Sequence, residues 1–203
     1  MKILFDINHS AHVHFFRNLI SLLIKTNNSV LVLSRKNKEN VCKLLDNYGI
    51  EHIPISSKTN SLHGNILELF SRNMKILSLA RKFNPDFLLG ITSNSIGLIG
   101  SILRKPSICF GDTEHSRLGN YISFIFASHV FSPTCYNHDM GRKYKRQLYY
   151  PGYHEFSYIT PSEFIIDKPK KKRFLFRTVA WDAVHDIGDS GLNLKQKIDI
   201  LKN

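Results

Sequence analysis

The sequence predicts an α/β protein with a doubly wound parallel sheet, followed by an incomplete second domain. Three observations predict this fold. Short runs of β-branched and aromatic residues alternate with segments of helical apolar periodicity between residues 2 and 150. Polar residues follow most of these runs, and prolines stand just ahead of two of them. Such alternation is typical of a parallel sheet that is covered by helices on both faces.

Seven segments have the composition of strands. They are Ile3–Ile7, Val30–Ser34, His52–Ile55, Phe87–Ile91, Ser107–Phe110, His129–Ser132 and Gln147–Tyr150. Apolar residues recur at helical spacing between them, which predicts six helices. These cover His12–Lys25, Lys38–Tyr48, Asn65–Phe83, Ser95–Leu103, Ser116–Ala127 and Asn137–Lys143. Pro85 and Pro106 each precede a strand, at positions where a helix cannot continue.

The end of the chain predicts a linker and the start of a second domain. Residues 1–157 form the predicted Rossmann-like N-terminal domain, 158–173 a basic linker that contains KPKKKR, and 174–203 an incomplete C-terminal domain. Within this last region we expect a strand, a polar loop and a helix, at 174–178, 180–191 and 192–202. One strand and one helix cannot bury a core. The chain is therefore either the front of a longer two-domain protein, or its end packs on the first domain.

The net charge of +12, from 28 Lys and Arg against 16 Asp and Glu, predicts a surface that attracts anions. A non-catalytic nucleic-acid-binding domain is one alternative, but we do not favour nucleic acid as the partner. The aromatic residues occupy core-periodic positions and are not interleaved with the basic clusters. No run approaches the roughly 20 apolar residues that cross a bilayer. We expect a cytoplasmic protein, with peripheral contact at the anionic inner face of the membrane as an extension of that expectation.

Several kinds of chemistry are excluded by motifs that the sequence lacks. Neither G-x-G-x-x-G nor a Walker A sequence occurs, so we expect no NAD or P-loop chemistry. Cys42, Cys109 and Cys135 are odd in number and widely spaced, which argues against a disulfide framework and against a C-x-x-C site. We expect neither a cofactor nor a metal ion.

Polar side chains gather after the predicted strands. Since the carboxyl ends of parallel strands meet at one edge, where open α/β sheets bind ligands, these side chains are candidate site residues. The candidates at this edge are Asn8, His9, Ser10, His12, Arg35, Ser93 and Asn94. His9 and His12 are the candidate bases, because imidazole titrates near neutral pH. The alternative is that His12 and His14 only cap the following helix and face solvent.

Two further clusters carry side chains with useful chemistry. Asp112 and Glu114 follow the fifth strand beside His115, and two carboxylates with an imidazole could perform acid–base work. Helix capping explains the same residues. A metal site is less favoured, because adjacent residues seldom all point at one ion. Trp181 stands in the polar loop of the second domain, where it could stack on a ligand or anchor the loop.

Taken together, these residues resemble the N-terminal domain of a GT-B glycosyltransferase-like protein. The match that we can name is a prokaryotic domain family of unknown function, which is related to UDP-N-acetylglucosamine 2-epimerases. The resemblance covers about residues 1–155 and rests on FDI at 5–7, HVHFF at 12–16, KFNPD at 82–86, PSI at 106–108, DTEH at 112–115, FASHVFSPT at 126–134 and PG at 151–152. It implies that this domain holds the acceptor or supplies catalytic groups. Most of the nucleotide-sugar pocket would belong to the C-terminal domain.

The resemblance implies a nucleotide-sugar enzyme of cell-surface polysaccharide biosynthesis, most simply a glycosyltransferase. His9 or His12 would be the base, and Asp112 or Glu114 the acid or orienting group. Asn8, Ser10, Arg35, Ser93, Asn94, His115 and Trp181 would bind substrate. The partners would be a nucleotide-sugar and a sugar or lipid-linked acceptor. A UDP-N-acetylglucosamine 2-epimerase-like enzyme is the alternative, and a chain inactive by itself, completed by a separate polypeptide, is a further expectation.

Overall fold

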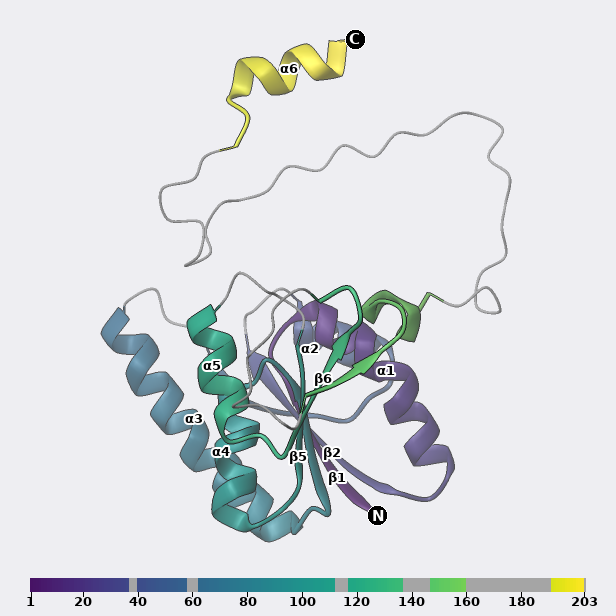
Figure 1. The fold of residues 1–203 in the computed structure, drawn as a ribbon, viewed down its shortest axis with the longest axis vertical. Helices are drawn as coiled ribbons and strands as arrows, with labels where there is room; N and C mark the ends of the chain where they lie inside the picture. Colours follow the sequence, from purple (N-terminus) through teal and green to yellow (C-terminus); the bar gives the residue numbers. More distant parts are fainter. Residues whose placement is uncertain (37–39, 58–61, 112–116, 137–146, 160–190, 203) are drawn as a thin grey trace. The chain divides into compact units, whose positions relative to one another are not determined.

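The computed structural model describes residues 1–36, 40–57, 62–111, 117–136, 147–159 and 191–202 (Figure 1). The chain divides into two compact units, Met1–Phe164 and Ile165–Asn203, and their boundary falls inside the predicted linker. In the second unit, helix α6 (Leu194–Lys202) lies within the predicted 192–202 helix. It begins with a capping box, in which Asn193 and Gln196 exchange side-chain-to-backbone hydrogen bonds of 2.9 Å. The strand expected at 174–178 and the loop that carries Trp181 lie outside the described residues.

The described strands form one parallel sheet in the order β3-β2-β1-β4-β5-β6-β7. Their bounds are β1 (Lys2–Ile7), β2 (Ser29–Lys36), β3 (Ile53–Ser57), β4 (Phe87–Ile91), β5 (Ser107–Phe110), β6 (His129–Pro133) and β7 (Gln147–Tyr150). All seven predicted strands are confirmed, each to within two residues at either end. The sheet grows in one direction from β1 to β3 and in the other from β4 onward, so it is doubly wound, with its switch point between β1 and β4.

Helices cover both faces of this sheet. Their bounds are α1 (Ser10–Lys25), α2 (Val41–Asn47), α3 (Leu62–Phe83), α4 (Asn94–Leu103) and α5 (Arg117–Ile125). In Figure 1, α1 lies on one side of the strands, while α3, α4 and α5 lie on the other. After β7 comes a short 3₁₀ helix, η1 (His154–Ser157). The helix expected over Asn137–Lys143 lies outside the described residues. None of the described helices combines the length and the apolar character that a membrane crossing requires.

Two separate cores result from the alternation of side chains along the strands. On one face, Phe5 of β1 is buried with Phe16 of α1 and Leu45 of α2. On the other face, Leu4 of β1 is buried in a second cluster with residues from α3, α4 and α5. Asp6 shares the face of Leu4 because it stands two residues later in the same strand. The fold therefore places one carboxylate at the end of an apolar face, directly beneath α3 and α4.

Candidate functional site

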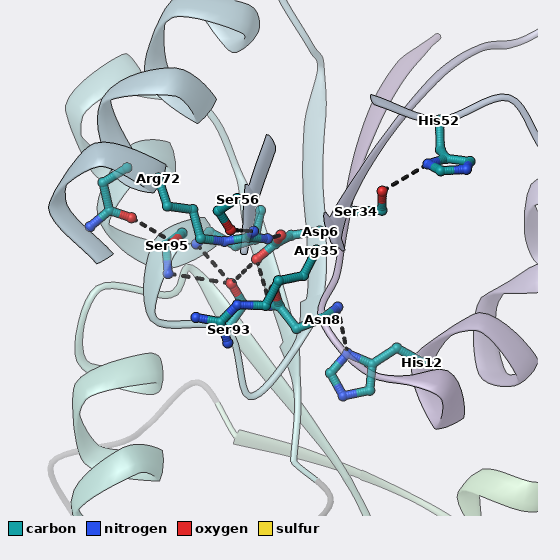
Figure 2. Close-up of polar contacts among 12 residues, drawn as sticks. Asp6, Asn8, His12, Ser34, Arg35, His52, Ser56, Arg72, Ser93 and Ser95 are labelled. Carbon is teal, nitrogen blue, oxygen red and sulfur yellow. Dashed lines mark hydrogen bonds and ion pairs between the residues drawn. The ribbon is translucent and has the colours of Figure 1, made fainter. Parts of the chain in front are cut away.

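A buried polar network begins at Asp6, whose exposed fraction is 0%. The Asp6 carboxylate forms an ion pair with Nη2 of Arg72, which comes from α3. Ser93 Oγ donates to Asp6 Oδ2 at 2.6 Å, and Asn8 Nδ2 donates to the same oxygen at 3.0 Å. Figure 2 shows these side chains converging from β1, α3 and the start of α4. The carboxylate is satisfied on both oxygens, which is the condition for burying a charge without a large penalty.

Arg72 is itself buried, with an exposed fraction of 2%. Its Nη1 donates to Ser56 Oγ at 2.7 Å, so the guanidinium connects β3 to β1 across one face of the sheet. Because its charge is matched by Asp6, this arginine contributes little net positive potential to the space above it. The pair is best described as a neutral support beneath the site.

The start of α4 is fixed to the network through Ser93. Ser93 Oγ accepts from the backbone amides of Ser95 and Ile96, both at 3.3 Å, and so caps the helix. This close approach requires Gly90 in β4, since a Cβ there would lie 2.9 Å from Ser93 Cβ and 3.1 Å from Ile96 Cγ1. The side chain that caps α4 is therefore also the one that holds Asp6.

The two candidate histidines stand side by side after β1, with ring centroids 5.8 Å apart. His9 caps α1, because its Nδ1 accepts the backbone N–H of Ala11 at 3.1 Å. His12 is 7% exposed, and its Nδ1 accepts the backbone N–H of Asn8 at 3.4 Å. In a neutral imidazole with Nδ1 as acceptor, the proton resides on Nε2. The capping histidine is thus His9, not His12 or His14.

His14 lies outside this pair, on the face of α1 that meets Tyr48 and Tyr158. Its Nδ1 is 3.3 Å from the Tyr48 hydroxyl, and its ring centroid is 5.5 Å from that of Tyr158. Partial burial, and then the positive charge of Arg17, lower the pKa of His14. This histidine belongs to the packing between α1 and the segment that follows η1.

The side chains above the network surround a hollow of about 500 Å³, which we call the polar hollow. It lies at the switch point of the sheet, beside the carboxyl ends of β1 and β4, and its volume is typical of small-molecule sites. A second ion pair stands in its wall, where Arg35 Nε donates to Glu68 Oε1 at 3.2 Å and Nη2 contacts Oε2. The lining residues are Asn8, His9, Ala11, His12, Arg35, Glu68, Leu69, Arg72, Ile91, Thr92, Ser93, Asn94 and Ser95.

Six of the predicted site residues meet around the polar hollow. They are Asn8, His9, His12, Arg35, Ser93 and Asn94. Ser10 opens helix α1 but is not among the lining residues. Asp112, Glu114, His115 and Trp181 lie outside the described residues, so their predicted roles stay predictions. Within the described ranges, no group of three or more His, Cys, Asp or Glu side chains is arranged to hold a metal ion.

Glu68 and Arg72 line the polar hollow and Asp6 supports it, but none of the three is among the predicted site residues. A signal for Arg72 was present, because this residue shares a helical stripe with Ile76 and Ala80, both of which are buried. A charged residue on an apolar stripe needs a buried partner of opposite charge. Nothing comparable in the sequence marks Glu68 as the partner of Arg35.

The strand order and the hollow at its switch point define the class of protein, which is the Rossmann-like N-terminal domain of a GT-B fold. The chain belongs to the family described as "Protein of unknown function (DUF354)", which matches residues 1–155. The resemblance to a prokaryotic family of unknown function is thereby confirmed. No curated protein matches the sequence.

Three solved structures illustrate the likeness in fold. MurG from Acinetobacter baumannii has a TM-score of 0.59 at 12% identity, over 73% of this chain and 45% of that one. UDP-GlcNAc 2-epimerase from Neisseria meningitidis, bound to UDP-GlcNAc, has 0.53 at 14%, over 65% and 40%. MnaA from S. aureus, in a structure with UDP, has 0.54 at 14%, over 65% and 39%. The chain thus spans less than half the length of each of these three, and the likeness establishes the fold.

Proposed function

We propose that this chain is the acceptor-binding part of a nucleotide-sugar enzyme that transfers a glycosyl group in cell-surface polysaccharide synthesis. The observation that carries the proposal is the charge balance of the polar hollow. Arg35 and Arg72 line it, yet each is paired with a carboxylate. A diphosphate needs cations that are not already neutralised. A neutral, hydroxyl-rich sugar instead needs side-chain amides and hydroxyls, such as those of Asn94 and Thr92.

The donor would then be held mainly by the second half of the fold. The resemblance to GT-B proteins assigns most of the nucleotide-sugar pocket to the C-terminal domain, which leaves the acceptor for the N-terminal one. Similar proteins support a uridine nucleotide as donor, since the N. meningitidis structure contains UDP-GlcNAc and the S. aureus structure contains UDP. The net charge of +12 supports peripheral contact with an anionic membrane face, where a lipid-linked acceptor would be found.

His12 is the base in the proposed reaction. The acceptor oxygen attacks the anomeric carbon, the sugar–phosphate bond breaks, and the nucleoside diphosphate leaves with the electron pair. Nε2 of His12 takes the hydroxyl proton after the ring's own proton has moved from Nε2 to Nδ1, so the reaction requires the tautomer opposite to the one that the Asn8 contact favours. This change gives up the 3.4 Å hydrogen bond from the Asn8 amide, whereas the His9 Nδ1 keeps the α1 cap at 3.1 Å. His9 therefore keeps its proton on Nε2 and serves as a hydrogen-bond donor to the substrate. Asp112 or Glu114 would be the acid or orienting group.

The binding part of the proposal is tested on this chain by saturation-transfer NMR with methyl β-N-acetylglucosaminide, and by calorimetry with UDP. We expect the sugar to bind in the polar hollow and UDP not to displace it. Asn94→Ala should weaken sugar binding, whereas Asn47→Ala, at a position outside the hollow, should not. This difference would locate the bound sugar in the polar hollow. Competition of UDP with the sugar for this hollow would show that the paired arginines still bind a diphosphate, and would overturn the proposal.

The reaction is tested by measuring UDP release from UDP-GlcNAc with and without acceptor, in protein that carries a complete second domain. His12→Gln should lower turnover at least about 100-fold, the usual contribution of a general base. His129→Gln, at an exposed histidine at the start of β6, should leave it unchanged. Formation of the 2-epimer without an acceptor would favour the epimerase alternative, in keeping with the likeness to the N. meningitidis enzyme. Salt-sensitive nucleic-acid binding with neither reaction would overturn the proposal.

A further inference from the structure

A second hollow, of about 310 Å³, adjoins the polar hollow and shares Ala11 and Ile91 with it. We call it the aromatic hollow. It lies between α1 and the η1 segment, which Figure 1 shows beside α1. The two hollows therefore follow one another along the carboxyl ends of the strands, and one ligand of sufficient length can occupy both.

The wall of the aromatic hollow is built from rings that hold one another in place. The ring centroid of Phe15 lies 4.6 Å from that of His154, and it is 5.0 Å from that of Phe110, which packs behind the wall and is not a lining residue. Tyr153 lines the same hollow and is 56% exposed, so its ring is available to a ligand. Such rings present apolar faces of fixed orientation, against which another ring can lie flat.

The polar side chains at this wall include a carboxylate, a phenol and an imidazole, those of Glu155, Tyr158 and His154. None of the described residues that line it is Lys or Arg. A nucleotide would bring phosphates close to the Glu155 carboxylate, which like-charge repulsion disfavours. Arg17, which reaches this wall from α1, is already engaged with the Tyr158 carbonyl at 3.3 Å. A pyranose ring suits both features, because its C–H face packs on an aromatic ring while its hydroxyls donate to a carboxylate.

We propose that the aromatic hollow binds a sugar ring, and that the acceptor is a saccharide of at least two rings, with its reacting residue in the polar hollow and the adjoining ring against Tyr153 and Glu155. The identification of this ligand as the acceptor rests on the proposed function. The binding of a saccharide ring at this wall does not, because it follows from the lining residues alone.

The test compares the affinity of this chain for methyl β-N-acetylglucosaminide and for N,N′-diacetylchitobiose, by calorimetry. We expect the disaccharide to bind about tenfold more tightly, a gain near the upper end of what a pair of stacked aromatic rings contributes. Tyr153→Ala and Glu155→Gln should each remove this advantage and leave monosaccharide affinity unchanged. Tyr121→Ala, at a tyrosine of α5 that is 49% exposed, is the matched control and should change neither affinity. Glu155→Gln keeps the shape of the side chain, so a loss of affinity in this variant cannot be attributed to unfolding of the η1 segment.

Each result has a distinct meaning. Equal affinity for the two sugars, or an advantage that survives both Tyr153→Ala and Glu155→Gln, would overturn the inference. An advantage that depends on these residues, in a protein without UDP-sugar turnover, would support the sugar site while the proposed function fails. Turnover that shows no preference for disaccharide acceptors would overturn the inference and leave the proposed function standing.

Discussion

The polar hollow and the aromatic hollow lie at the same edge of the sheet, but different interactions stabilise the residues that form them. Beneath the polar hollow, Asp6 and Arg72 are fully buried and each is satisfied by several partners. The aromatic hollow is bounded in part by rings at the start of a short 3₁₀ helix, where Tyr153, the residue before η1, is more than half exposed. The polar hollow therefore depends on a rigid, neutral charge network, whereas the aromatic hollow depends on surface rings that can be removed separately.

Replacing Arg72 should produce the largest effect. Arg72→Met leaves the Asp6 carboxylate buried without its partner, so we expect the free energy of unfolding to fall by about 3–5 kcal/mol. Urea unfolding measures this loss. Asp6→Asn combined with Arg72→Met should recover much of it, and Arg81→Met, on the exposed face of the same helix, should cost little. A small loss for Arg72→Met would show that the network does not support the polar hollow.

Removing the Ser93 hydroxyl should have the next largest effect. Ser93→Ala deletes both the cap of α4 and one donor to Asp6, for an expected loss of about 1–3 kcal/mol in the free energy of unfolding. Ser101→Ala, at an exposed position of the same helix, is the control. Equal losses for the two variants would mean that the α4 cap contributes nothing specific.

Cysteine reactivity distinguishes the lining of the aromatic hollow from the core on the α3–α5 face of the sheet. Burial raises the pKa of the Cys109 thiol to about 12, whereas Cys135 lines the aromatic hollow and is exposed. Since the thiolate is the reactive form, iodoacetamide at pH 8 should modify Cys135 and leave Cys109 intact in the folded protein. Peptide mass spectrometry reads out both sites. Early labelling of Cys109 would show that the sheet opens at this edge.

The smallest expected effect is a dependence of stability on pH through His14. Its pKa is lowered in the folded state, so between that value and the ordinary 6.5 the unfolded chain binds the proton and the folded chain does not. Stability should therefore be complete above about pH 6.5 and decrease as the pH falls through the folded pKa. Urea midpoints at pH 7.5 and 5.5 should differ less in His14→Gln than in the parent. His129→Gln should keep the parent's difference.

The periodicity of the chain predicted the sheet because burial along a parallel strand is a local property. Helix starts were predicted less well. The second helix was expected from Lys38, yet α2 begins at Val41, after Asn40 adopts a left-handed conformation with φ of 58°. Asparagine tolerates that conformation better than most residues, and an apolar pattern carries no information about it.

The candidate site was predicted in outline and not in its chemistry. Its histidines were located correctly at the sheet edge, but which ring nitrogen carries the proton depends on the backbone amides of Asn8 and Ala11. The pairing of Asp6 with Arg72 spans 66 positions in sequence and exists only once α3 has packed on the sheet. Contacts of that kind cannot be deduced from local pattern.

The attachment of the η1 segment to α1 has a mechanical consequence. Asn18 Nδ2 donates to the Ser157 carbonyl at 2.9 Å, and Arg17 Nη2 donates to the Tyr158 carbonyl at 3.3 Å. Tension along the chain beyond residue 159 would therefore load the helix whose first turn carries His12. In a single-molecule pulling experiment from that end, these two hydrogen bonds must break before the force reaches β7.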